Sequence, residues 1–69
     1  MSAAAMYTLR VFYPGETAPH ETVTLERAAD VLTRIPRLLE GHGQCEKVVV
    51  FLGPTRLFAV DCSGNRLDE

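Results

Sequence analysis

Four residues of the sequence have side chains that could support metal or nucleophilic chemistry: His20, His42, Cys45 and Cys62. Zinc favours Cys and His ligands, but its usual signature is two close ligand pairs, such as two CxxC units. Here His42 and Cys45 have such a spacing, and the other two residues are distant in the sequence. We therefore predict no metal site and no cofactor, and interpret the four residues as loop histidines and small, partly buried thiols.

Acid–base or nucleophilic catalysis would require a nucleophile beside a base. The candidate nucleophiles are Cys45, Cys62 and Ser63, and the candidate bases are His20 and His42. No family signature surrounds either cysteine, and a chain of 69 residues has little room for a concave pocket of roughly 300 Å³ or more. We predict no catalytic residues and no enzyme activity, and keep a thiol- or metal-dependent activity only as a minor alternative.

The two cysteines flank a predicted pair of strands and could lie close together. If residues 53–54 (Gly-Pro) form a two-residue hairpin turn, Leu52 pairs with Thr55, and counting outwards places Cys45 opposite Cys62. A four-residue loop would instead move the residue opposite Cys45 two positions along the chain. The start of the sequence has neither a basic segment nor a long apolar segment for export, so we expect free thiols in a reducing cytoplasm. We interpret any proximity of the cysteines as incidental.

The elements that would position these residues are two pairs of strands on either side of one helix. Residues 47–52 (KVVVFL) contain five consecutive apolar residues, too few for a helix and too uniform for a strand with one wet face. Such a strand belongs in the middle of a sheet that is covered on both sides. Apolar–polar alternation and the positions of Gly and Pro predict strands at residues 6–13, 21–25, 46–52 and 56–60. Residues 61–65 (DCSGN) have too few ligands for a calcium loop and are typical of a turn.

The helix is predicted between the second and third strands from a continuous stripe of apolar residues at helical spacing. The stripe consists of Ala28, Val31, Leu32, Ile35, Leu38 and Leu39. Thr24 is the predicted N-cap, and Asp30 and Arg34 are spaced to form an ion pair on the wet face. Pro36 predicts a kink or a break in the helix, and Gly41 suits its C-terminal end.

The element order is ββαββ, which predicts a single small α+β domain over residues 6–69, preceded by a disordered tail at residues 1–5. A helix that links the second strand to the third must cross the sheet with right-handed connectivity. Placing the two most apolar strands in the middle gives a four-stranded, mainly antiparallel sheet in the order 2-1-3-4, with the helix on one face. The alternative order 1-2-3-4 is less favoured because residues 21–25 (ETVTL) suit an edge strand.

One helix can cover only one face of this sheet, so the other face is the predicted contact surface. The residues assigned to it are Arg10, Phe12, Thr22, Thr24, Val49, Phe51 and Phe58. Lys47 has the same parity as Val49 and Phe51 and favours water, which places these two on the open face. Val48 and Val50 are accordingly assigned to the side of the helix.

An open apolar face usually marks an interaction site. We therefore predict a protein-interaction domain that forms a homodimer through this face or through an edge strand. One alternative is a regulatory inhibitor or accessory subunit that uses the same face to bind a larger protein. The other is a different strand register in which the C-terminal tail folds back with Leu67 as a plug, so that nothing binds.

Composition and charge bound the remaining classes of function. The chain is 46% apolar and 23% charged with a net charge of −2, which is typical of a globular domain and unfavourable for binding a nucleic-acid backbone. No segment approaches the roughly 20 apolar residues of a membrane span. RNA binding through Arg10, Phe12, Phe51 and Phe58 on the open face is a minor alternative. Residues 55–67 resemble segments of small bacterial proteins, and the resemblance implies no particular activity.

Overall fold

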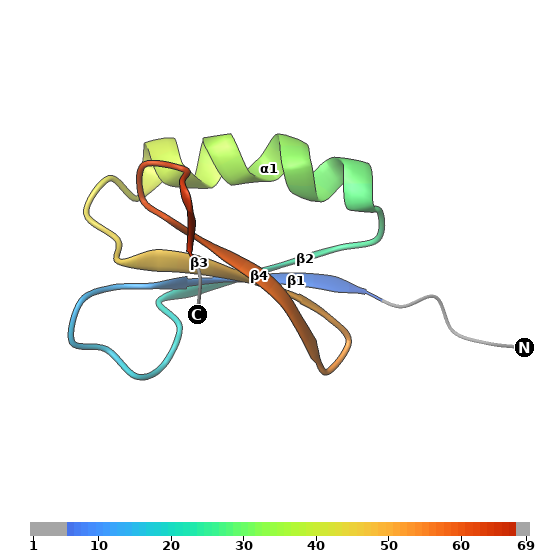
Figure 1. Ribbon diagram of the computed structural model, residues 1–69, viewed down its shortest axis with the longest axis horizontal. Coiled ribbons are helices and arrows are strands. Elements are labelled where there is room, and N and C mark those ends of the chain that lie inside the picture. The colour runs from blue at the N-terminus through green and yellow to red at the C-terminus, as the bar shows by residue number, and fades with distance from the viewer. Residues whose placement is uncertain (1–5, 68–69) are drawn as a thin grey trace, which may run out of the picture.

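The computed structural model describes residues 6–67, and this range contains five strands and one helix (Figure 1). The elements are β1 (Tyr7–Phe12), β2 (Glu21–Leu25), α1 (Ala28–Gly41), β3 (Lys47–Leu52), β4 (Thr55–Asp61) and β5 (Arg66–Leu67). The strands form one antiparallel sheet in the order β2-β1-β3-β4-β5, with α1 against one face. The predicted α+β fold and the order of the first four strands are confirmed, and β5 is an additional short strand. The tail predicted at residues 1–5 lies outside the described residues.

The hydrophobic core lies between α1 and the sheet. Its fully buried large side chains come from the two central strands and are Leu9, Val11, Val48 and Val50. The helix contributes Val31, Ile35 and Leu38 to the same cluster. Because alternate side chains of a strand point to opposite faces, the burial of Val48 and Val50 against α1 confirms the predicted orientation of β3.

The helix begins later than the sequence predicts. Thr24 was the expected N-cap, but it pairs with Thr8 inside β2, and the N-cap is Arg27, which has an extended backbone. Strand pairing through Leu25 holds Thr24 in an extended conformation and so overrides its capping preference. The predicted Asp30–Arg34 pair is also not formed within residues 6–67, because Asp30 lies 3.9 Å from Arg27 instead.

α1 continues through Pro36 to Gly41 and lies nearest to β1 and β2. This position leaves one margin of the predicted apolar stripe outside the core, and Leu32 is 69% exposed. Leu32 borders a shallow apolar groove of about 220 Å³ between the helix and β4, which also contains Leu57 and Phe58. The groove exists because α1 does not cover the outer strands of the sheet.

The hairpin between β3 and β4 contains an irregularity that changes one prediction. Leu52 pairs with Thr55 across the expected two-residue turn, where Gly53 has a positive φ of 57°. The register then shifts, since Phe51 is opposite Arg56 but Val50 is opposite Phe58, which leaves Leu57 as the extra residue of a β-bulge. The bulge turns Phe58 towards α1, so its assignment to the open face was wrong.

Candidate functional site

The sheet face opposite α1 contains six of the seven predicted contact residues. They are Arg10, Phe12, Thr22, Thr24, Val49 and Phe51. Arg10 lies between Thr22 on β2 and Val49 on β3, so these residues form one row across three strands. The structure therefore brings the predicted set together, except for Phe58.

This face is covered by its own basic side chains. The guanidinium of Arg10 lies 4.5 Å from the centre of the Phe51 ring, and the ammonium of Lys47 lies 5.8 Å from that of Phe12. Both are cation–π distances, at which the charged group shields the ring from water. Val49 is 5% exposed. The large apolar side chains that are exposed within residues 6–67 are Met6, Leu32 and Leu57, and none of them belongs to the predicted contact set.

Strand β2 forms one edge of the sheet and, among the described strands, pairs with β1 alone. Its sequence ETVTL has neither Pro nor Lys, and its pairing with β1 is regular over all five residues. Thr22 and Thr24 are exposed. Proline, charged side chains and bulges are the usual features that prevent an edge strand from pairing with another chain. In β2 only the first residue, Glu21, is charged, so the rest of the strand is an unprotected edge.

The opposite edge of the sheet, formed by β4 and β5, is irregular. β5 has two residues and pairs with Ala59 and Val60 of β4, so the first part of β4 has no outer neighbour among the described strands. That part contains the bulge at Leu57. A bulge twists a strand away from regular pairing, which makes this side a poor template for a further strand.

A polar cleft of about 350 Å³ lies between α1 and the β2 edge. It is lined by Leu25, Asp30, Thr33, Arg34 and Arg37. Neither Arg34 nor Arg37 forms an ion pair or hydrogen bond with another residue of the range 6–67. The sequence does not predict this cleft, because the side of α1 that faces β2 depends on where the helix lies on the sheet.

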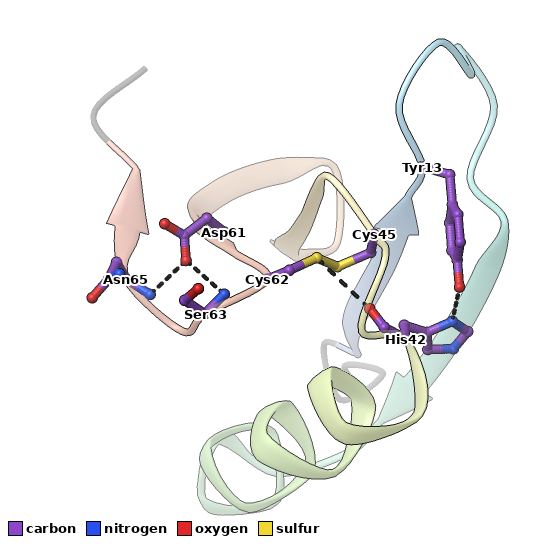
Figure 2. The surroundings of a disulfide bond; sticks show 7 residues. All are labelled: Tyr13, His42, Cys45, Asp61, Cys62, Ser63 and Asn65. Carbon is purple, nitrogen blue, oxygen red and sulfur yellow. Dashed lines mark hydrogen bonds between the residues drawn. A yellow bond between two sulfur atoms is a disulfide. The ribbon is translucent and has the colours of Figure 1, made fainter.

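The residues considered for chemistry gather at one end of the domain, where a disulfide joins Cys45 to Cys62 (Figure 2). The bond connects the segment after α1 to the turn after β4, and the two Cα atoms are 5.8 Å apart. The prediction of free thiols was therefore wrong: the tight β3–β4 turn brings the cysteines together despite the bulge. Disulfides are rare in reducing compartments, so the cysteines no longer support the predicted cytoplasmic location.

His42 connects two other elements through its ring. Its Nε2 lies 2.8 Å from Oε1 of Glu21, and its Nδ1 lies 2.7 Å from the hydroxyl oxygen of Tyr13. A carboxylate can only accept, so in the neutral ring Nε2–H donates to Glu21 and Nδ1 accepts from the Tyr13 hydroxyl. The ring of His20 lies over Tyr13 with a centroid separation of 4.2 Å.

The side chains of this cluster connect elements of the fold. The ring of His42 points towards Tyr13 and away from the disulfide (Figure 2), so this ring does not face either sulfur. The backbone of His42 lies near the disulfide, since its carbonyl oxygen is 3.8 Å from Sγ of Cys62. No group of three or more His, Cys, Asp or Glu side chains within residues 6–67 is placed to hold a metal ion. The polar chain Glu21–His42–Tyr13 therefore ties β2 to the end of α1.

Replacing Tyr13 with phenylalanine should lower the free energy of unfolding by about 0.5–1.5 kcal/mol, because the hydroxyl donates to His42. The measurement is urea unfolding followed by circular dichroism. Tyr7→Phe is the matched control, since the hydroxyl of Tyr7 has no hydrogen bond within the described part of the chain. Equal loss of stability in both variants would show that the His42 contact contributes nothing specific.

Asp61 closes the turn beside the disulfide. Its carboxylate accepts backbone N–H groups of Asn65 and Ser63, each at 2.9 Å, which confirms the predicted turn (Figure 2). The bond from the backbone of Asn65 is the main reason that the pKa of Asp61 is lowered from its usual value. Gly64 has a positive φ of 91° in this turn, a conformation that favours glycine.

Comparison with known proteins does not assign a function: no protein family, curated protein or solved structure matches this chain. Within residues 6–67, no helix is long and apolar enough to cross a membrane. The edge strand β2 with the adjacent polar cleft is the surface whose geometry is best suited to recognition.

Proposed function

We propose that the protein is an association domain that forms a homodimer by pairing β2 with β2 of a second copy. The observation that carries the proposal is the unprotected β2 edge, which has five regularly paired residues and two exposed threonines. An edge strand presents a row of unpaired N–H and C=O groups to solvent. Antiparallel pairing of two such edges satisfies these groups and gives a closed two-fold dimer.

The size of the domain is compatible with the proposal, although the Cys45–Cys62 disulfide already supplies one cross-link. A chain of 69 residues buries only about 60% of the surface of its unfolded form, so small domains are often stabilised by a second subunit or a cross-link. Dimerisation through β2 would double the sheet without exposing new apolar surface. The face opposite α1 is a weaker candidate, because Arg10 and Lys47 already lie over its aromatic rings.

The test is the solution mass by light scattering across a concentration series. We expect twice 7.6 kDa for the unmodified protein at micromolar concentration, and the monomer mass for the double variant Thr22→Lys/Thr24→Lys. Two lysines on each edge repel the second copy and are a natural means of blocking an edge strand.

Thr55→Lys/Ser63→Lys is the matched control, since it adds the same charge at exposed positions outside β2. It should remain a dimer, and circular dichroism should show all three proteins folded. An unmodified protein that stays monomeric up to about 100 µM would overturn the proposal. A monomer that binds an extended segment of another protein through β2 would instead favour the accessory-subunit alternative.

A further inference from the structure

Taking the proposed β2 dimer as its basis, we infer that the two copies meet about a two-fold axis through Thr24, and that Arg37 in the polar cleft binds Asp30 of the second copy. Arg37 and Asp30 line the same cleft, and Arg37 has no partner within residues 6–67. The interface would then be one continuous sheet with the two α1 helices side by side on the same face.

The sequence of the edge selects this register. A two-fold axis through a residue places that residue opposite its own copy, and neighbours on either side pair in opposite order. With the axis at Thr24, the two threonines face each other, and Val23 faces Leu25 of the second copy. Facing threonines and facing apolar residues are both favourable cross-strand pairs. An axis at Val23 would instead place Glu21 against Leu25.

The spacing of the helices agrees with this arrangement. Neighbouring strands are about 4.8 Å apart, so a helix over β1 and β2 has its axis about 2.4 Å inside β2. The two-fold axis between the paired edges lies about 2.4 Å outside β2. The two helix axes are therefore about 10 Å apart, close to the usual separation of packed helices.

The position along the helix also agrees. α1 runs back over the sheet in the direction opposite to β2 (Figure 1). Counted from the N-cap Arg27, Thr24 lies about 10 Å back at strand spacing, and the midpoint between Thr33 and Arg34 lies about 10 Å along the helix. A two-fold axis at Thr24 therefore passes close to this midpoint.

Antiparallel helices that meet at this midpoint have complementary side chains. Asp30 faces Arg37 of the second copy, and Arg34 faces Thr33, in both directions across the axis. The hydroxyl of Thr33 donates to the carbonyl of Ala29 at 3.1 Å, which leaves its lone pairs free to accept from Arg34. Within residues 6–67 the carboxylate of Asp30 contacts only Arg27, at 3.9 Å and at an exposed position, so it can exchange partners at little cost.

Charge reversal tests the contact directly. In the dimer, Asp30→Arg places an arginine opposite Arg37 at both symmetric contacts, and Arg37→Asp places an aspartate opposite Asp30 at both. Each single variant should therefore weaken the dimer by about tenfold or more. The double variant Asp30→Arg/Arg37→Asp restores opposite charges and should dimerise like the unmodified protein. An equimolar mixture of the two single variants should form a heterodimer, detected by native mass spectrometry. Glu16→Arg changes the net charge as Asp30→Arg does, lies in the β1–β2 loop and should have no effect.

The outcomes separate this inference from the proposed function. If the unmodified protein dimerises and the single reversals have no effect, β2 pairing stands and the Thr24 register is overturned. If the single variants dissociate but neither the double variant nor the mixture recovers, the Asp30–Arg37 contact is overturned. Recovery in both supports the inference, and a monomeric unmodified protein overturns the inference together with the proposed function.

Discussion

Replacing Leu9 with alanine should leave a large fraction of the protein unfolded at 25 °C. Leu9 is fully buried at the centre of β1, where it lies between Val23 of β2 and Val50 of β3 and beneath α1. Removing a buried leucine side chain costs about 2–5 kcal/mol, because the cavity left behind collapses only in part. A hydrophobic core in a domain of this size rarely supplies more than about 3–5 kcal/mol, so the variant loses most of its stability.

The same substitution at Leu32 is the control. Leu32 is 69% exposed, so Leu32→Ala should change the free energy of unfolding by no more than about 0.5 kcal/mol. Both variants are measured by urea unfolding at one protein concentration, because association makes apparent stability depend on concentration. Equal unfolding midpoints for the two variants would show that the β1 position is not part of the core described above.

Reducing the disulfide should have the second largest effect. The bond joins residues separated by 17 positions, and a cross-link over a loop of that length stabilises the folded state by about 3 kcal/mol, mainly by restricting the unfolded chain. For a domain of this size the expected fall in melting temperature is roughly 10–20 °C. The measurement is thermal unfolding with and without a reductant.

Cys45→Ser separates the cross-link from other effects of the reductant. The variant should melt at the temperature of the reduced protein, and addition of reductant should leave that temperature unchanged. Cys45 is 8% exposed, so serine at this position also buries a hydroxyl, and Cys62→Ser provides a second variant at a more exposed site. A single melting temperature for the unmodified protein in both conditions would contradict the stabilising role of the bond.

The sequence was sufficient for the elements and their order, because each depends on local patterns. The apolar run at residues 47–52 requires a central strand, and ETVTL suits an edge. The orientation of β3 was also predictable, since Lys47 indicates which of its neighbours lie on the sheet face opposite α1. These are consequences of the two-residue period of a strand, which operates over a few positions.

The errors came from features that depend on distant parts of the chain. Regular pairing beyond the two-residue turn would place Phe58 opposite Val49 on the open face, and one extra residue at Leu57 reversed its direction. Thr24 has the side chain of an N-cap, but pairing with β1 holds it in the strand. The predicted two-residue turn placed the two cysteines opposite each other, but the expected cytoplasmic location favoured free thiols over the disulfide that the structure contains.

The cleft beside α1 could not be predicted at all. The sequence predicts Arg34 only as an ion-pair partner of Asp30 and assigns no role to Arg37. Their common surface with Leu25 appears only when the helix is placed over β1 and β2. The positions of the cations over Phe12 and Phe51 could not be predicted either, because they depend on the register between β1 and β3. Sequence patterns identify faces, whereas the pairing of elements decides what each face presents.

The bulge at Leu57 has a consequence for how far assembly can proceed. A sheet with two edges that can both pair with further strands would add molecules at both edges and grow into a fibre. Here the border formed by β4 and β5 is short and twisted, and only β2 is regular. Joining two molecules through β2 uses the receptive border of each and leaves the irregular one on the outside. In the proposed dimer, growth would therefore stop at two molecules, and the bulge at Leu57 would limit polymerisation.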